Sequence, residues 1–304
     1  MRLAKFIFLT LLIPMGGGLI SCEEDIKIDT ETGSPKIGIY GNITTDKKHH
    51  SITISRTNDF YSKGGIEMIS GAHAFIVDLT DADTFYMTEH SAGIYETESV
   101  AGKIHHTYQL NVTVPDHGEE LHFFAESTID TCPQKIDSLQ VLKYTMFDEE
   151  YDDIYKICPY FQTTQKDIYY MFDMSINERP ITDTLTRKAF LHLGAMSGLY
   201  YNGEEMSIIY KELNVYPHGI FYLDQTLTKE KVEIGDIVHL TLYSIPKGYY
   251  GYYGDITNSI GSNPLMGSPT NVRTNIHGKE KEAVGYFHAA SCIHYQQKVN
   301  KLPE

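Results

Sequence analysis

Cys22 is the residue whose surroundings specify its chemistry most closely. It ends the run Leu-Ile-Ser-Cys at 19–22, which follows a short cationic start and an apolar stretch from Phe6 to Ile20. A segment of this kind is typical of a secretory signal, and small residues before a cysteine form a lipobox. We therefore expect cleavage before Cys22 and lipid on its thiol and on its new amino group. The apolar stretch is shorter than the roughly 20 residues of a transmembrane helix.

The other residues that can do chemistry do not fall into catalytic patterns. The run Gly-Ala-Met-Ser-Gly at 194–198 has the wrong spacing for a nucleophile elbow. His117 and His122 are five residues apart, so they do not share one face of a helix as the histidines of zinc proteases do. The sequence contains no glycine-rich loop for phosphate or dinucleotides. It therefore predicts a protein that is not an enzyme and needs no cofactor.

Fourteen histidines raise the question of a metal site, because imidazole is a common ligand of transition metals. The densest places are two adjacent pairs, His49-His50 and His105-His106. Neighbouring residues of a strand point to opposite faces, so only one histidine of each pair could join a given site. No spacing typical of a closed site accompanies them. The sequence therefore predicts solvated turn histidines and no metal site, with metal or haem binding as an alternative.

An acidic run, Asp-Glu-Glu-Tyr-Asp-Asp at 148–153, offers the clustered carboxylates that calcium prefers. It lacks the glycine at the sixth position and the closing glutamate of an EF-hand loop. We interpret the run as a solvated link between two domains.

Three cysteines remain once Cys22 carries lipid, namely Cys132, Cys158 and Cys292. An exported chain can oxidise a pair of cysteines, and Cys132 with Cys158 is the closest pair in sequence. An odd count fixes no pairing, so free buried cysteines remain the alternative.

Tyrosines gather at 249–253 (Tyr-Tyr-Gly-Tyr-Tyr), in a chain with 23 tyrosines and no tryptophan. On a helix Tyr249, Tyr252 and Tyr253 share one face at the spacing of a core stripe. Tyr250 is left as the exposed member, and we predict that it contacts a partner or ligand, because tyrosine combines a flat apolar ring with a polar tip. The missing tryptophan weakens a carbohydrate-binding interpretation.

Asn263 precedes Pro264 in a segment bounded by Gly261 and Gly267. Proline fixes its own φ and drives the residue before it to an extended backbone, so the segment predicts a rigid turn. We interpret the turn as a loop that packs between elements, with contact between Asn263 and a ligand as the alternative.

The net charge excludes one class of partner. The chain carries −15 at neutral pH, and removal of residues 1–21 with Arg2 and Lys5 makes it −17. A body this acidic repels nucleic acid and anionic lipid surfaces. We predict no binding to nucleic acid.

The elements that position these residues are strands. From Ile37 onward apolar residues alternate with polar ones, which is the period of strands with one buried face. Six or seven such segments lie within about 100 residues, punctuated by turn signals. We predict an immunoglobulin-like or transthyretin-like β-sandwich at 36–135, after a signal peptide at 1–21 and a flexible tether at 22–35.

The second half keeps this β character. Residues 136–304 are predicted to form an antiparallel β domain with little helix, either a sandwich or a barrel. The expected strands are at 167–176, 187–193, 219–223 and 236–245, and the one helix that packs on the sheet is at 249–260. The stretch 196–210 is ambiguous.

Several stretches are similar to an uncharacterised lipoprotein family. They are Gly71–Asp78, Gly93–Tyr95, Tyr108–Val112 and Ile136–Leu139 in the first half, and Asn263–Leu265, Pro269–Gly278 and Gly285–Phe287 in the second. The chain thereby resembles the Bacteroidota "domain of unknown function" lipoproteins that are often encoded beside SusC-like TonB-dependent receptors. Leu265 departs from the usual aromatic residue of that family, and residues 277–284 carry more charge.

The resemblance implies an outer-membrane lipoprotein, anchored through lipid on Cys22, with a TonB-dependent receptor as its partner and a role in nutrient capture or uptake. The residues Glu23, Glu24 and Asp25 resemble the surface-export signal of lipoproteins in that phylum, which implies that the protein faces the cell exterior. The ligand stays unknown. A structural or adhesive surface protein is the alternative of another class, because immunoglobulin-like sandwiches serve both roles.

Overall fold

Short strands dominate the fold. The computed structural model describes residues 35–57, 66–132, 135–144, 154–162, 168–181, 189–193, 215–217, 221–224, 232–261 and 272–302. The strands of the first half are β1 (Ile37–Thr44), β2 (Ser51–Arg56), β3 (Glu67–Met68), β4 (His73–Asp78), β5 (Asp83–Ser91), β6 (Ile94–Thr97), β7 (Thr107–Asp116) and β8 (Glu119–Thr128). Buried and half-buried residues alternate along β1, β4 and β7, as the period-two pattern of the sequence predicts.

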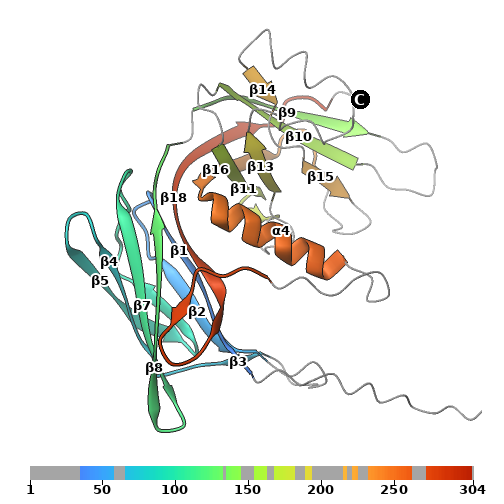
Figure 1. Cartoon of the computed structure of the whole chain (residues 1–304). Coiled ribbons are helices and arrows are strands. Elements are labelled where there is room, and N and C mark those ends of the chain that lie inside the picture. The colour runs from blue at the N-terminus through green and yellow to red at the C-terminus, as the bar shows by residue number, and fades with distance from the viewer. Residues whose placement is uncertain are drawn as a thin grey trace, which may run out of the picture. The chain divides into compact units, whose positions relative to one another are not determined.

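Two layers of these strands face each other (Figure 1). One layer runs β18-β1-β2-β6-β5 and the other β5-β4-β7-β8-β17, where β17 is His277–Gly278 and β18 is Ala283–Lys298. A single hydrophobic core lies between them and takes side chains from both layers, such as Ile39, Ile54, Leu110 and Phe123. The strand β5 belongs to both layers, because its first half pairs with β4 and its second half with β6.

The last strand joins the two halves of the chain. The first part of β18, from Ala283 to Ala290, pairs in parallel with β1, and its second part pairs antiparallel with β16 (Ile237–Ile245). One mixed sheet of fourteen strands results. The sequence predicts neither this strand nor a parallel pairing, since the second half is expected to be antiparallel. Residues 35–304 form one compact unit, and the boundary at residue 135 stays a prediction.

The sheet of the second half is buried on both faces. It contains β11 (Ile168–Ile176), β12 (Arg179–Pro180), β13 (Ala189–Leu193) and β16. On one face Tyr170, Phe172 and Leu242 pack with residues of β9 (Ile136–Tyr144) and β10 (Ile154–Gln162). A four-stranded sheet forms from β9, β10, β14 (Val215–Pro217) and β15 (Phe221–Asp224).

The opposite face carries the helix α4 (Lys247–Gly261), which the sequence predicts at 249–260. The helix starts after Pro246, whose carbonyl oxygen accepts the backbone N–H groups of Tyr249 and Tyr250. Tyr249 and Tyr252 are buried against β11, β16 and β18, so the predicted core stripe is confirmed for both. The described part of the chain is thus mostly β, with this one helix.

Four predicted strands of the second half are present within one or two residues of their expected positions, as β11, β13, β15 and β16. The ambiguous stretch 196–210 lies outside the described residues. Among the helices of the described part, none combines the length and the apolar character needed to cross a bilayer.

Candidate functional site

A row of rings crosses the outer face of one layer. In the registers of β4 with β5 and β7, and of β8 with β7 and β17, the residues Tyr86, Phe75, Asn111, Phe124 and His277 lie side by side on five neighbouring strands. We call these five residues the ring row. Tyr86 is 73% exposed and His277 is also exposed, while the three middle members are half-buried.

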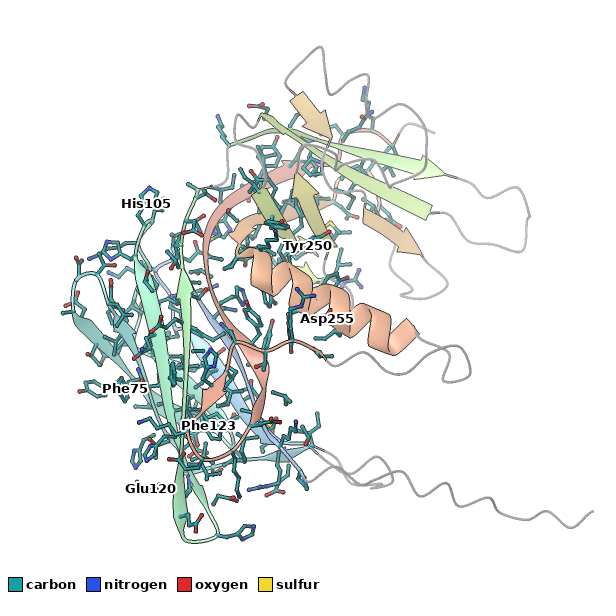
Figure 2. All side chains as sticks on the ribbon, in the orientation of Figure 1. Phe75, His105, Glu120, Phe123, Tyr250 and Asp255 are labelled. Atoms are coloured by element: carbon teal, nitrogen blue, oxygen red, sulfur yellow. The ribbon has the colours of Figure 1, made fainter. Side chains whose placement is uncertain are left out.

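The strand period places the ring row away from the core. Ala74 and Ile76, on either side of Phe75, are buried, and Phe123, beside Phe124, points into the core. Figure 2 labels Phe75 and Phe123, which belong to opposite faces of this layer. The ring row therefore faces outward from the sandwich.

Ring contacts and amide hydrogen bonds hold the ring row in place. The ring centres of Phe75 and Tyr86 are 6.0 Å apart, and those of Phe124 and His277 are 5.2 Å apart. Between the two ring pairs, Asn111 Nδ2 donates to Gln109 Oε1 at 3.1 Å. Flat rings, amides and imidazole on one face can stack on a ligand and exchange hydrogen bonds with it.

Polar side chains border the ring row on both sides. On one side, Gln109 Nε2 donates to Glu126 Oε1 at 2.8 Å. On the other side, Thr113 Oγ1 lies 3.1 Å from His122 Nδ1, and His73 is paired with Thr113 in the neighbouring strand. Lys279 continues the second of these rows, because its backbone N–H donates to the carbonyl oxygen of His122 at 3.0 Å. Amide, hydroxyl and imidazole groups on this border can exchange hydrogen bonds with the hydroxyl groups of a ligand.

Sequence reasoning does not find the ring row. Its members are spread from residue 75 to residue 277, and they meet only through the register of four strand pairs. The sequence carries only a weak signal for the ring row. It consists of single aromatic residues where the alternating pattern of a strand calls for a polar residue, as at Phe75, Tyr86 and Phe124.

Tyr250, the predicted contact residue, is half-buried in α4 (Figure 2). Its ring centre lies 5.1 Å from that of Tyr169, and it packs at the edge of the tyrosine core beneath the helix. Burial raises the pKa of its hydroxyl. Only part of this side chain is open to a ligand, and no ring-row residue belongs to its cluster.

One histidine of each pair is exposed and the other is not, although neither pair lies within a strand. His49 and His105 are exposed, whereas His50 is buried and the His106 side chain is 15% exposed. The prediction of solvated turn histidines is therefore wrong for His50 and His106. Burial lowers the pKa of His50 to about 4, and its Nε2 lies 3.0 Å from the carbonyl oxygen of Val100.

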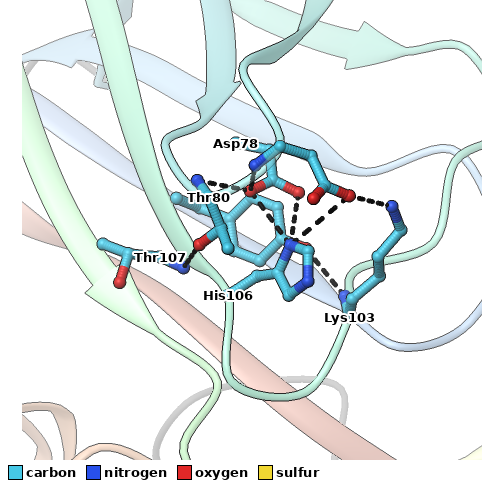
Figure 3. A network of polar contacts seen from close by, with 7 residues as sticks. Asp78, Thr80, Lys103, His106 and Thr107 are labelled. Carbon is cyan, nitrogen blue, oxygen red and sulfur yellow. Dashed lines mark hydrogen bonds and ion pairs between the residues drawn. The ribbon is translucent and has the colours of Figure 1, made fainter.

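His106 belongs to a polar network at the end of β4 (Figure 3). Its Nδ1 lies 2.8 Å from Asp78 Oδ2, and Asp78 Oδ1 accepts the backbone N–H groups of Thr80 and Asp81. Burial opposes ionisation of Asp78, but the hydrogen bond from His106 and those backbone groups together hold its pKa below the usual range. Lys103 pairs with Asp81. The carboxylates are thus already engaged, and the network fixes a turn.

Within the described part of the chain, two groups of side chains could hold a metal ion. One is Asp78, Asp81 and His106 of this network, and the other is Asp46, Cys292 and His294. Cys132 and Cys292 are free thiols, the first exposed and the second buried, so of the two possibilities left open by the sequence Cys132 takes the unpaired one. Burial raises the pKa of Cys292 to about 11, so its thiol is protonated at neutral pH and is a poor nucleophile.

Several predicted residues lie outside the described residues. They are Cys22 with the export residues Glu23, Glu24 and Asp25, the turn residue Asn263, and the acidic run at 148–153.

A comparison with family models matches residues 23–293 to a family described as "Domain of unknown function (DUF4249)". A comparison with curated protein sequences gave no match. Among solved structures, the crystal structure of chicken CNTN1 FN1-FN3 domains is similar at 12% identity with a TM-score of 0.25. That match covers 70% of this chain and 61% of the other, and a TM-score this low supports no conclusion about function.

Proposed function

The chain belongs to the DUF4249 family, and on that premise we propose that it is an outer-membrane surface lipoprotein that serves a TonB-dependent nutrient uptake system as a non-catalytic binding component. The lipobox at Cys22 supports the anchor, and Glu23, Glu24 and Asp25 support exposure to the cell exterior. The receptor partner comes from the family resemblance of the sequence.

The ring row is the observation that carries the binding role. Folding buries most large rings, whereas the ring row places an exposed tyrosine and two half-buried phenylalanines on one outward face, which is the arrangement of a contact surface. We interpret the two layers, one of which carries the ring row on its outer face, as an immunoglobulin-like sandwich, a fold on which many proteins carry binding sites.

We assign the ring row to a neutral saccharide chain. Sugar rings present C–H faces that stack on Tyr86, Phe75 and Phe124, and their hydroxyl groups can bond with the Asn111 amide. The bordering Gln109 and Glu126 extend these polar contacts along the strands. With no tryptophan in the chain, tyrosine and phenylalanine must supply the stacking surface.

The test is binding of the detergent-solubilised lipoprotein to an array of neutral oligosaccharides. We expect binding by the unmodified protein, and Tyr86→Ala and Phe75→Ala each to weaken it about tenfold, because stacking on one ring contributes roughly 1 kcal/mol or more. Ile234→Ala is the matched control, since Ile234 is 68% exposed but lies outside the ring row. We expect it to bind as the unmodified protein does.

Two results would contradict this assignment. One is binding to an array of oligopeptides without binding to any saccharide. The other is saccharide binding that neither ring substitution changes. Far-ultraviolet circular dichroism of each variant distinguishes a lost contact from a lost fold.

A further inference from the structure

Asp46, Cys292 and His294 meet because β1 and β18 are parallel neighbours. The register pairs Thr44 with Ala290, and the backbone N–H of Thr45 donates to the carbonyl oxygen of Ala290 at 3.2 Å. Asp46 therefore lies beside the part of β18 that follows. Cys292 and His294 are two residues apart on that strand, so their side chains leave it on the same face.

The three side chains present their ligand atoms to a common point. His294 Nε2 lies 2.8 Å from Asp46 Oδ1, and the sulfur, nitrogen and oxygen atoms all lie within 4.8 Å of one another. Zinc–ligand distances of about 2.0–2.3 Å in tetrahedral geometry place ligand atoms roughly 3.3–3.8 Å apart. The group needs only small side-chain shifts to reach that geometry.

Neighbouring hydroxyl groups orient two of the ligands. Thr241 Oγ1 lies 3.1 Å from His294 Nδ1, which leaves Nε2 directed at Asp46. Thr45 Oγ1 accepts the backbone N–H of Cys292 at 3.0 Å and lies 3.6 Å from its sulfur. Metal-binding histidines usually donate their second ring N–H to a hydrogen-bond acceptor, and the hydroxyl oxygen of Thr241 can accept it here.

Exposure differs across the group in the way an accessible site requires. Cys292 is buried, the Asp46 side chain is 26% exposed, and the His294 side chain is 59% exposed. An ion can enter from the His294 side, and solvent can supply a fourth ligand. Lys48 lies 3.9 Å from the other Asp46 oxygen, Oδ2, and leaves Oδ1 to the site.

We propose that Asp46, Cys292 and His294 bind a zinc ion. A thiolate and an imidazole select zinc over calcium and magnesium, which take oxygen ligands. Binding releases the proton of the Cys292 thiol, and the imidazole of His294 keeps its proton on Nδ1, beside Thr241 Oγ1, while Nε2 faces the ion. The group Asp78, Asp81 and His106 differs, because Lys103 and backbone N–H groups already engage its carboxylates.

Cobalt(II) is the probe, because a cobalt–thiolate bond gives a charge-transfer absorption in the near ultraviolet. We expect the metal-stripped, detergent-solubilised lipoprotein to bind one cobalt ion with this absorption and to lose it when zinc is added. Cys292→Ser is expected to abolish the absorption. His294→Gln is expected to weaken binding at least about tenfold, and because His294 is exposed this variant is expected to fold.

Cys132→Ser and His106→Gln are the matched controls, because Cys132 is the other free thiol described and His106 lies in the other acidic group. Both are expected to keep the absorption. The proposal would be overturned if the folded unmodified protein showed no cobalt–thiolate absorption. It would also be overturned if Cys292→Ser kept the absorption, or if His294→Gln bound cobalt as tightly as the unmodified protein.

Discussion

Asp116 shows how a single residue ties distant segments together. Its side chain is 3% exposed at the end of β7, and it accepts hydrogen bonds from Arg56 Nη2 and Lys281 Nζ, each at 2.8 Å. These two cations, Lys281 first and Arg56 second, hold the pKa of Asp116 below its usual range. The carboxylate thereby joins β2, β7 and the turn before β18.

We predict that Asp116→Asn lowers the free energy of unfolding by about 2 kcal/mol at neutral pH. The asparagine lacks the negative charge that pairs with Arg56 and Lys281 in this buried position. A carboxylate with a lowered folded-state pKa contributes stability above its unfolded pKa and loses it as pH falls through the folded value. The difference between variant and unmodified protein should therefore shrink below about pH 4. Urea unfolding at neutral and acidic pH measures both effects.

Asp81→Asn is the matched control, because the Asp81 side chain is 42% exposed and pairs with the exposed Lys103. Exposed pairs contribute about 0–1 kcal/mol, so a small change is expected. Equal losses in the two variants would contradict the role given to burial at Asp116.

The sequence predicts correctly which side chains are buried where the spacing of neighbouring residues decides it. Tyr249 and Tyr252 fall in the core because helical spacing alone puts them on one face. The prediction that His50 and His106 are solvated is wrong, because adjacent histidines in a sequence give no sign of which ring points inward. The ring row and the group at Cys292 escape prediction for another reason, since strand register and parallel pairing create them.

Gly285 is the backbone position on which the element β18 depends. Its φ is +106°, and a Cβ atom there would lie 1.9 Å from the carbonyl oxygen of Ile39 on the neighbouring strand. Only glycine adopts this backbone at such close approach without strain.

We predict that Gly285→Ala destabilises the protein by about 3 kcal/mol or more. The alanine would have a disfavoured φ, and its methyl group would clash with the backbone of Ile39 in β1. Gly118→Ala is the matched control, because Gly118 has a φ of +91° but no heavy atom within 4 Å of the added methyl group. It should cost about 1–2 kcal/mol. Thermal unfolding of both variants tests the prediction, and an equal loss would refute the role of close approach.

At the scale of elements, alternation predicts the main strands of the first half and β16 in the second. It fails for β18, because residues 286–292 are buried without a break and so carry no period-two signal. The strand lies against β1 on one side and β16 on the other, with buried neighbours on both faces. A continuous buried run of this kind is typical of central strands.

The whole molecule combines a predicted lipid anchor with an acidic β body. The charge of −17 expected after signal removal repels anionic surfaces, so we propose that lipid on Cys22 holds the body at the membrane. Composition and the lipobox predict these features, while the joining of the two halves through β18 follows only from the structure.

The measurement that tests the proposed uptake role most directly is purification of the tagged lipoprotein from its native envelope in mild detergent, followed by mass spectrometry. We predict a TonB-dependent receptor in stoichiometric amount. The Cys22→Ser variant is the control and is expected to leave the membrane fraction and to lose the receptor, because it lacks the lipid anchor. A clean monomer, or copies of this chain alone, would contradict the uptake role.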